Sequence, residues 1–301
     1  MPTPDALPGP REPTLQAALR QAAAELRAAG IEDAGGDARR LAQALLRMTA
    51  AQVLSHPERP LSAQEADRLG RGIARRRARE PVSRILGERD FYGRTFAICP
   101  ATLDPRPDSE TVIAAALEIA REEGWTSRPI RILDVGTGSG CLLLTLLCEL
   151  PQATGLGTDI SAAALDTASL NAGRLGLDPR VTWLRADGLE SIAGPFHMLV
   201  ANPPYVRTAE IPGLEPEVRE FDPTQALDGG PDGLAIYRRL VPRIADVIPS
   251  GGWVVLEVGH DQAADVAALL ASKEAGMDVA RIRLHQDAAG KGRCVAARTL
   301  G

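Results

Sequence analysis

The chain has 301 residues, of which 45% are hydrophobic, so it can bury a substantial core and has room for more than one folded unit. Its formal net charge of -5 argues against a dedicated nucleic-acid binder, which usually carries a basic face. The longest apolar run, Cys141 to Cys148, is far shorter than the roughly 20 residues that span a bilayer, and no signal-peptide pattern is present. We therefore expect a soluble, cytoplasmic protein without a metal site, and a monomer because no long apolar face is left over.

The first 80 residues predict a helical domain. Residues 1–13 are rich in proline and predict an irregular terminus. Three amphipathic stretches follow: one capped by Thr14, one from about Asp37, and one that begins with the capping-box spacing Ser62-x-x-Glu65. No residue pattern in this domain carries chemistry, so we expect it to recognise a partner or to pack on the larger domain that follows.

The third of these helices ends in an arginine-rich segment, residues 71–79. Such a density of positive charge is compatible with an RNA or ribosome contact. A solvated helix face is the simpler interpretation, because charge runs on helices usually face water.

A linker is expected over residues 81–103. Glu80-Pro81 interrupts the helical pattern, and Val82 to Leu86 is predicted to be extended. Phe91-Tyr92 and Phe96 to Ile98 then predict a β-hairpin. An α/β domain is expected over residues 104–301.

A proline-stiffened loop, Pro105 to Glu110, opens this larger domain and leads into a helix from Ser109 to about Glu122. The loop could close over a ligand. By itself it is equally compatible with a plain helix entry.

A glycine-rich turn follows the predicted strand Ile130 to Val135 and precedes a helix from Cys141. Its residues are Gly136, Thr137, Gly138, Ser139 and Gly140. Alternate glycines allow a tight strand-to-helix turn and a close approach of the backbone to a ligand. The next strand should place Asp159 at its tip, where a carboxylate can accept hydrogen bonds from both ribose hydroxyls of an adenosine. The combination indicates a nucleoside site rather than a bare turn.

The identity of the nucleoside ligand can be narrowed from the residues around the turn. A dinucleotide-binding fingerprint would need glycine at position 141 or 143, where Cys141 and Leu143 stand, and the Gly-Lys-Ser or Gly-Lys-Thr of a phosphate loop is absent. S-adenosylmethionine fits better, because its methionine tail carries no pyrophosphate. A further strand, Val181 to Leu184, leads to Asp187 and Gly188, which can accept from the adenine amine and donate to the ring. The alternative for this pair is a simple Asp-Gly turn.

The quartet Asn202-Pro203-Pro204-Tyr205 follows an apolar run, Phe196 to Val200, that predicts a buried parallel strand. The prolines end the strand, so the quartet should lie at its carboxyl end, where open α/β sheets bind ligands. The Asn202 side-chain carbonyl and the fixed backbone carbonyls offer aligned acceptors to an NH₂ group. Acceptors placed for a pyramidal nitrogen favour the transition state of an amide or aromatic amine over its planar ground state. Tyr205 offers a flat face on which a planar amide or base can rest. The alternative interpretation of the quartet is a turn that merely stops the strand.

Together these segments resemble the class I S-adenosylmethionine-dependent methyltransferases that carry an Asn-Pro-Pro-Tyr motif. More closely, the chain resembles the peptide chain release factor glutamine methyltransferases, the PrmC or HemK family. The resemblance covers nearly the whole chain and includes, beyond the segments above, the runs Ala101 to Glu110, Asp222 to Leu234 and Gly252 to Gly259, with Glu257 in the last.

The resemblance implies a doubly wound, Rossmann-like α/β methyltransferase sheet with a small all-α N-terminal domain. It implies transfer of a methyl group from S-adenosylmethionine to the side-chain amide nitrogen of the glutamine in a release factor's Gly-Gly-Gln motif. The implied cofactor-binding residues are Gly136, Thr137, Gly138, Ser139, Gly140, Asp159, Asp187, Gly188 and Asn202. Asn202, Pro203, Pro204 and Tyr205 are implied to hold the glutamine, with Asn202, Pro203 and Tyr205 catalytic.

Two residues depart from the family pattern. Asp104 stands where the family usually has an apolar residue, and Gly188 occupies a place that is often aromatic in relatives. Loss of an aromatic ring at position 188 removes a stacking surface for adenine.

The expected mechanism is direct displacement at the sulfonium methyl group, without a covalent enzyme intermediate and without a general base acting before transfer. The histidines at positions 197, 260 and 285 are accordingly interpreted as surface or packing residues.

Two other functions stay open at this point. One is a nucleic-acid methyltransferase acting on an adenine or guanine amine, favoured by the arginine-rich segment, although no stable nucleic-acid binding is expected from the acidic balance. The other is a non-catalytic adaptor that binds ribosomal partners.

Overall fold

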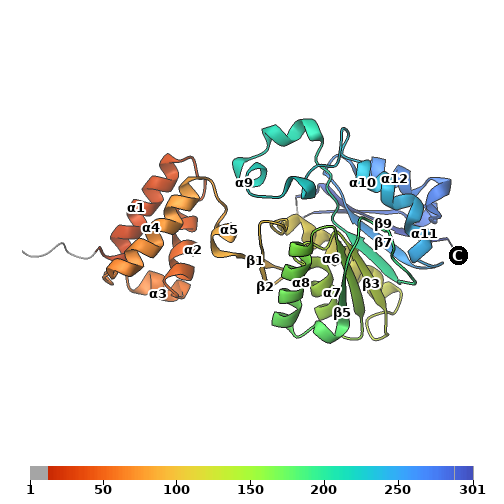
Figure 1. Cartoon of the computed structure of the whole chain (residues 1–301), viewed down its shortest axis with the longest axis horizontal. Helices are drawn as coiled ribbons and strands as arrows, with labels where there is room; N and C mark the ends of the chain where they lie inside the picture. The colour runs from red at the N-terminus through yellow and green to blue at the C-terminus, as the bar shows by residue number, and fades with distance from the viewer. Residues whose placement is uncertain (1–12, 288, 301) are drawn as a thin grey trace, which may run out of the picture. The chain divides into compact units, whose positions relative to one another are not determined.

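The computed structural model describes residues 13–287 and 289–300 (Figure 1). Contacts divide the chain into two compact units between Leu86 and Gly87. The irregular N-terminus expected over residues 1–13 lies, except for Pro13, outside the described residues.

The first unit consists of helices around one small core. They are α1 (Leu15–Ala28), α2 (Ala34–Leu45), α3 (Ala50–Ser55), α4 (Ala63–Arg77) and α5 (Val82–Leu86). Thr14 caps α1 as predicted, and the Ser62–Glu65 capping box opens α4. Leucines such as Leu15, Leu26 and Leu41 are completely buried between the helices. These apolar stripes, together with the caps, account for the helical unit.

The prediction that Val82 to Leu86 is extended is wrong, because this segment is the short helix α5. Pro81 lies just before its first turn, where proline is tolerated, and its carbonyl accepts a hydrogen bond from the Ile85 N–H at 3.0 Å. Ile85 is buried in the core of the helical unit, and its carbonyl accepts from Arg75 at 3.2 Å. Tertiary packing therefore stabilises a helix that the sequence around a proline does not suggest.

The arginine-rich segment of α4 is largely neutralised within its own unit. Arg76 is buried and donates to Asp37 at 2.7 Å, and Arg75 pairs with Glu80 at 2.6 Å. The remaining arginines of this segment have partners as well: Arg71 pairs with Asp67, Arg77 lies 3.7 Å from Glu25, and Arg79 donates to the Gly30 carbonyl at 3.0 Å. These pairs favour a structural helix face over an RNA-binding one.

The second unit begins with a hairpin of β1 (Glu88–Phe91) and β2 (Arg94–Ala97), in the segment where a hairpin is expected. Tyr92 and Gly93 form its turn with φ of 49° and 72°. Two consecutive positive φ angles match the right-handed twist of the flanking strands.

A seven-stranded sheet forms the centre of the second unit, in the order β5-β4-β3-β6-β7-β9-β8. The strands are β3 (Arg131–Val135), β4 (Thr154–Asp159), β5 (Val181–Arg185), β6 (Met198–Ala201), β7 (Trp253–Glu257), β8 (Arg283–Gln286) and β9 (Gly292–Arg298). The five strands from β5 to β7 are parallel, and β9 runs antiparallel to both β7 and β8. The predicted doubly wound α/β sheet is confirmed.

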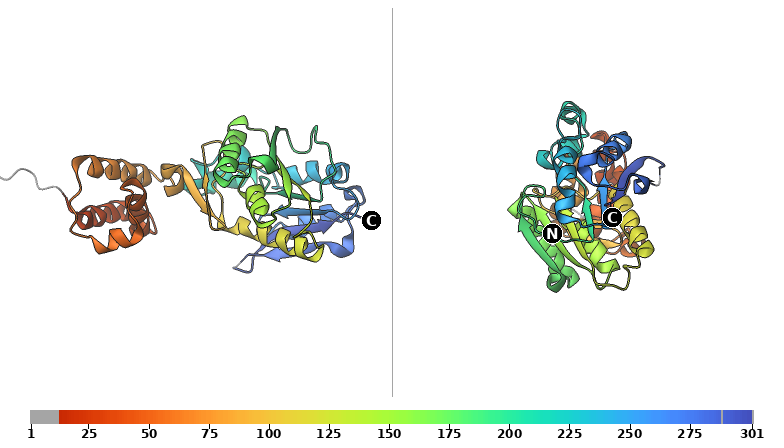
Figure 2. Two further views of the ribbon diagram at one scale, coloured as in Figure 1. Left: turned by 90° about the horizontal axis from the view of Figure 1, so that it is seen from below. Right: turned by 90° about the vertical axis from the view of Figure 1, so that its right-hand side faces the viewer.

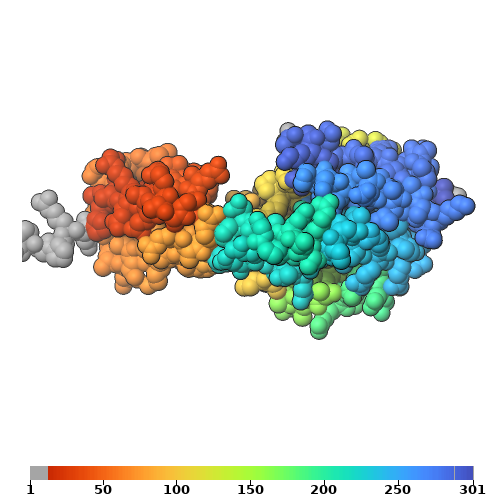
Figure 3. Space-filling view, turned by 90° about the horizontal axis from the view of Figure 1, so that it is seen from above, coloured from red at the N-terminus to blue at the C-terminus, as the bar shows by residue number. Residues whose placement is uncertain are grey.

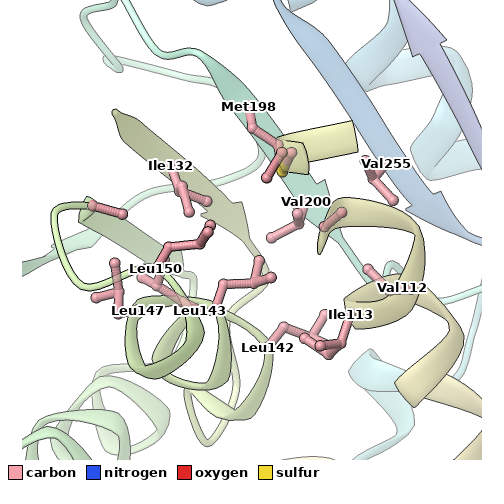
Figure 4. Close-up of a cluster of buried hydrophobic side chains, with 14 of the residues drawn as sticks. Val112, Ile113, Ile132, Leu142, Leu143, Leu147, Leu150, Met198, Val200 and Val255 are labelled. Carbon is pink, nitrogen blue, oxygen red and sulfur yellow. The ribbon is translucent and has the colours of Figure 1, made fainter. Parts of the chain in front are cut away.

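Helices cover both faces of this sheet (Figures 1 and 2). One face carries α6 (Glu110–Glu122), α7 (Cys141–Glu149) and α8 (Ala162–Leu175), and the other carries α10 (Ala235–Leu240), α11 (Ile244–Val247) and α12 (Ala263–Leu270). Figure 4 shows the first of these interfaces, where Ile113 of α6 and Leu143 of α7 meet Ile132 and Val200 of the sheet. Burial of the central strands β3, β6 and β7 on both faces explains their largely apolar sequences.

The connections contain short helices. They are α9 (Pro216–Arg219), η1 (Pro107–Ser109), η2 (Asp178–Arg180), η3 (Thr208–Gly213), η4 (Thr224–Ala226), η5 (Val241–Arg243), η6 (Lys273–Ala275) and η7 (Val279–Arg281). The segment from η3 to η4 forms part of the surface of the second unit (Figure 3). No helix in the part of the chain that the structure describes has the length and apolar character needed to cross a membrane.

Candidate active site

The sheet order reverses between β3 and β6, which lie side by side with Val135 opposite Ala201. The glycine-rich turn follows β3, and the quartet 202–205 follows β6. Open α/β sheets bind ligands at such a reversal, beyond the carboxyl ends of the strands. A cavity of about 810 Å³ lies there, within the size range of small-molecule sites.

Most of the predicted site residues line this one cavity. They are Gly136, Thr137, Gly138, Ser139, Asp159, Asp187, Gly188, Asn202, Pro203 and Pro204. Gly140 and Tyr205 are not among the described residues that line it. The fold thus brings together segments that are far apart in the sequence.

The turn after β3 depends on glycine backbone geometry. Gly136, Gly138 and Gly140 have φ of 71°, 56° and 80°, a region that side chains with a Cβ atom rarely adopt. The Thr137 N–H donates to the Thr158 carbonyl at 2.8 Å, and the Ser139 carbonyl accepts from Asn171 Nδ2 at 2.9 Å. These bonds hold the turn against the neighbouring elements.

Gly140 has a packing role instead of a place in the cavity wall. A Cβ atom there would lie 3.0 Å from Leu144 and 3.3 Å from Trp183. The glycine therefore permits close packing where α7 begins.

Asp159 joins the two predicted parts of the nucleoside site. Its Oδ2 accepts from the Gly138 N–H at 2.9 Å, and its Oδ1 accepts from the Ser161 N–H at 2.9 Å. The carboxylate is thereby fixed at the end of β4 on the cavity wall. Ile160 also lines the cavity and is 44% exposed, so an apolar surface lies beside the acid.

Asp187 is engaged by a cation that the sequence did not suggest. Its carboxylate lies 2.7 Å from Arg239 of α10, and both side chains are about half exposed, at 52% and 50%. Arg239 itself lines the cavity. Gly188 has φ of 60°, and a Cβ atom there would lie 3.4 Å from Leu240, so the position adjoins an apolar wall.

Asn202 is oriented by a buried serine. Its Nδ2 donates to Ser109 Oγ at 3.2 Å, and Ser109 is 2% exposed. Because the amide is planar, use of Nδ2 in this bond leaves Oδ1 on the opposite side as an acceptor. The proline-stiffened loop 105–110 therefore contributes a residue that contacts the quartet.

The ring of Tyr205 was expected to offer a flat face to the substrate, but the structure directs its side chain elsewhere. Its hydroxyl donates to Glu257 Oε1 at 3.4 Å, and Gln262 donates to its backbone carbonyl at 3.0 Å. Burial raises the pKa of Tyr205, and the charge of Glu257 adds to this effect. The phenol is thus directed toward Glu257 of β7 and is not among the described residues that line the cavity.

Sequence reasoning missed a buried acid beneath the glycine-rich turn. Asp134 is 0% exposed, and Thr137 donates to its Oδ2 at 2.6 Å. Burial raises the pKa of Asp134 to about 7, against the opposing effect of the Thr137 hydroxyl. The position of Asp134 inside the apolar run Ile132 to Val135 could have indicated a buried acid from the sequence.

Asp104, the departure from the family pattern, is held by charges. It is 1% exposed, its backbone N–H donates to Asp222 Oδ1 at 3.2 Å, and its Oδ1 lies 3.7 Å from Arg89. Arg106 pairs with the same Asp222 at 2.5 Å. The loop 104–106 is thus tied to the segment that carries the cavity-lining Pro223.

The three histidines that we interpreted as surface or packing residues are not among the described residues that line the cavity. His197 accepts from the Arg131 N–H at 3.1 Å through Nδ1 and lies edge-on to Trp125. His285 belongs to the edge strand β8 and lies 3.9 Å from Glu118.

The strand order and the loops at its reversal define a methyltransferase fold. A family model described as "Methyltransferase small domain" matches residues 119–213, and one described as "PrmC N-terminal domain" matches residues 17–87. The solved catalytic domain of hMettl16 in complex with the MAT2A 3′UTR hairpin 6 shares this fold, with a TM-score of 0.54 at 14% identity over 80% of this chain and 85% of that one.

Similar curated proteins identify the family within this class. A release factor glutamine methyltransferase of Bradyrhizobium diazoefficiens is 45% identical over 287 residues, covering 95% of each chain. One of Rhodospirillum rubrum is 44% identical over 280 residues, covering 93% of this chain and 83% of that one. The chain belongs to the release factor glutamine methyltransferase family, which confirms the resemblance seen in the sequence. Membership of a methyltransferase family implies the use of S-adenosylmethionine.

Proposed function

We propose that this protein transfers the methyl group of S-adenosylmethionine to the side-chain amide nitrogen of the glutamine in the Gly-Gly-Gln motif of peptide chain release factors. The observation that carries the proposal is the meeting of the glycine-rich turn and Asp159 with Asn202, Pro203 and Pro204 in one cavity. Relatives that are named for this activity and match at least 93% of this chain support the substrate.

The cavity fits the methyl donor. The turn offers backbone groups at positive φ, Asp159 offers a carboxylate for ribose hydroxyls, and Ile160 offers an apolar surface for the adenine ring. Asp187 and Gly188 border the same end, so an adenine amine there would share Asp187 with Arg239. When bound, S-adenosylmethionine supplies a methyl group on a positively charged sulfur, which is a good leaving group.

The quartet supplies the acceptors for the substrate nitrogen. Asn202 Oδ1, opposite the Nδ2 that Ser109 holds, can accept one N–H of the glutamine amide. Neither Pro203 nor Pro204 has a backbone N–H, so the neighbouring carbonyls face few local donors. Acceptors arranged in this way favour a pyramidal nitrogen, whose lone pair can attack the methyl carbon while the carbon–sulfur bond breaks. The extra proton on nitrogen becomes acidic only as the new bond forms and passes to water, so no general base is needed before transfer.

The nucleic-acid alternative loses the feature that favoured it. The five arginines of the segment 71–79 are engaged with acids or carbonyls of their own unit, which weakens the case for a basic nucleic-acid-binding face there. The likeness to a structure with bound RNA concerns the fold alone.

The test is incubation of the full chain with labelled S-adenosylmethionine and a purified release factor or its Gln→Ala variant at the Gly-Gly-Gln motif. We expect label on the release factor that has the glutamine and none on the Gln→Ala variant. Equal labelling of both proteins, or labelling of a nucleic acid instead, would contradict the proposed substrate, and no transfer to any acceptor would favour the adaptor.

A further inference from the structure

The hydroxyl of Ser109 does not have the role that serine usually has where a helix begins. Ser109 lies at the N-terminal cap position of α6, where a serine commonly accepts from backbone N–H groups of the first turn. Within the described part of the chain, its hydroxyl forms no such capping bond and instead accepts from Asn202 Nδ2 at 3.2 Å. The position of this serine therefore affects the orientation of the quartet.

The residue next to Ser109 is held by a cation from another element. Asp108 and Ser109 both belong to the three-residue helix η1. The Asp108 carboxylate lies 2.8 Å from Nη2 of Arg293, which stands on β9. Among the described residues, η1 also lacks a side-chain capping bond of its own. An ion pair with a residue far along the chain thus joins this short helix to the sheet.

Arg293 is itself fixed by the hairpin of β8 and β9. Its Nε donates to Asp287 Oδ2 at 3.0 Å, and its side chain is 14% exposed. Asp287 is fixed in turn, because its Oδ1 accepts from the backbone N–H groups of Ala289 and Lys291, both at 2.9 Å. A guanidinium group is planar and rigid, so the bond at Nε determines where Nη2 points. Arg293 therefore presents a cation to Asp108 in a defined direction.

A second arginine of the same strand lies at the other end of α6. Arg298 Nη2 lies 3.4 Å from Glu123, the C-terminal cap of α6. Both arginines join β9 to α6, but only the ion pair of Arg293 adjoins the serine that contacts the quartet. Because the Asp108 side chain is 47% exposed, its ion pair adds little to the stability of the fold, which favours a role in placing η1.

We propose that Arg293 is a positioning residue for the proposed methyl transfer. By holding Asp108, it keeps the Ser109 hydroxyl within hydrogen-bond distance of Asn202 Nδ2, and Oδ1 of this amide then faces the substrate. This inference rests on the proposed function. Arg293 is not among the described residues that line the cavity, so it acts through η1.

Loss of the ion pair releases η1 from β9. The Asn202 amide then loses its fixed partner and turns between two orientations. Only one of them presents an acceptor where the N–H groups of the substrate glutamine need one, because the other presents Nδ2, which is a donor.

The first test measures release factor methylation by Asp108→Ala, Arg293→Met and the double variant. Asp108→Ala is the milder change, because it leaves the buried Arg293–Asp287 pair intact. We expect each single variant to lower kcat by roughly tenfold, as for misplacement of a substrate-positioning group, with KM for the release factor and Kd for S-adenosylmethionine changed less than about threefold. The double variant should lose no more than the worse single variant, because both changes remove the same ion pair.

Arg298→Met is the matched control, since it removes the corresponding arginine at the other end of α6, and its kcat should stay within about twofold of the wild type. Ser109→Ala separates positioning from a general loss of structure. In this background Arg293→Met should not lower kcat further, whereas its effect on urea unfolding should persist. An unchanged kcat in either single variant, an equal loss in Arg298→Met, or a further loss in the Ser109→Ala background would overturn the positioning role.

A second measurement needs no substrate and separates this inference from the proposed function. The chain contains two asparagines, Asn171 and Asn202, so protein labelled with ¹⁵N in asparagine side chains gives two amide signals. The signal missing from Asn202→Ala belongs to Asn202. We expect its chemical shift to change in Arg293→Met in the direction seen in Ser109→Ala, and to stay in place in Arg298→Met. An unmoved signal in Arg293→Met would refute the inference, whereas absence of methyl transfer by the wild type would refute only the proposed function.

Discussion

Replacement of Asp134 by asparagine should change how the stability of the catalytic unit depends on pH. Asp134 is fully buried, and its pKa is raised from 3.8 to about 7, mainly by burial. The folded protein therefore holds the proton more tightly than the unfolded chain between these values. Stability that is present below pH 3.8 is lost progressively as pH rises to about 7 and is not regained above it. Asparagine keeps an acceptor for the Thr137 hydroxyl but has no proton to release.

The size of the effect follows from the two pKa values. A shift of one pKa unit corresponds to about 1.4 kcal/mol. Between about pH 5 and about pH 8, the wild-type protein should lose about 2.5 kcal/mol of unfolding free energy relative to Asp134→Asn. Asp166→Asn is the control, because Asp166 is exposed on α8 and its replacement should leave the difference within about 0.5 kcal/mol.

Urea unfolding followed by tryptophan fluorescence provides the measurement. All three tryptophans, Trp125, Trp183 and Trp253, belong to the second unit, so the signal reports on that unit alone. A stability difference between wild type and Asp134→Asn that is the same at both pH values would refute the reasoning.

Three further predictions concern the cavity and its supports. Asn202→Ala should lower turnover by about a hundredfold while changing S-adenosylmethionine affinity less, and unchanged turnover in methylation assays would remove its proposed role. Asp159→Ala should weaken S-adenosylmethionine binding by roughly tenfold or more in calorimetry, because charge-assisted hydrogen bonds to ribose are lost, and an unaltered dissociation constant would exclude it from the ribose site. Gly157→Ala should destabilise the unit by about 1–3 kcal/mol in urea unfolding, since the new Cβ would lie 2.3 Å from the Trp183 ring. Its control is Gly173→Ala within α8, where the nearest atom is an Asp178 oxygen at 3.5 Å, and equal loss in both would contradict the steric argument.

Local features of the sequence were sufficient for several of the elements and for most of the cavity wall. The Ser62–Glu65 capping box and the glycine alternation from 136 to 140 act through bonds and φ angles within a few residues. The quartet follows the buried strand β6 because two prolines cannot continue a sheet ladder. Parallel strands put their carboxyl ends at one edge, so the meeting of turn and quartet could be predicted before their distance was known.

Interactions between distant residues were decided only by the tertiary structure. α5 forms because Ile85 and Val82 pack on the helical unit, although Pro81 suggested an extended segment. The arginine-rich face of α4 is neutralised by acids such as Asp37 and Glu25, which no local spacing pairs with it.

The contacts that hold the quartet in place also join residues that are distant in the sequence. Tyr205 follows Asn202 closely in sequence, yet its hydroxyl faces Glu257 of β7, and Asn202 is held by Ser109 from the start of α6. The sequence alone specified which residue types are present and on which elements they stand. The packing of β6 against β7 and of α6 against the sheet decided which of them touch and which acids are buried, because both depend on contacts across many intervening residues.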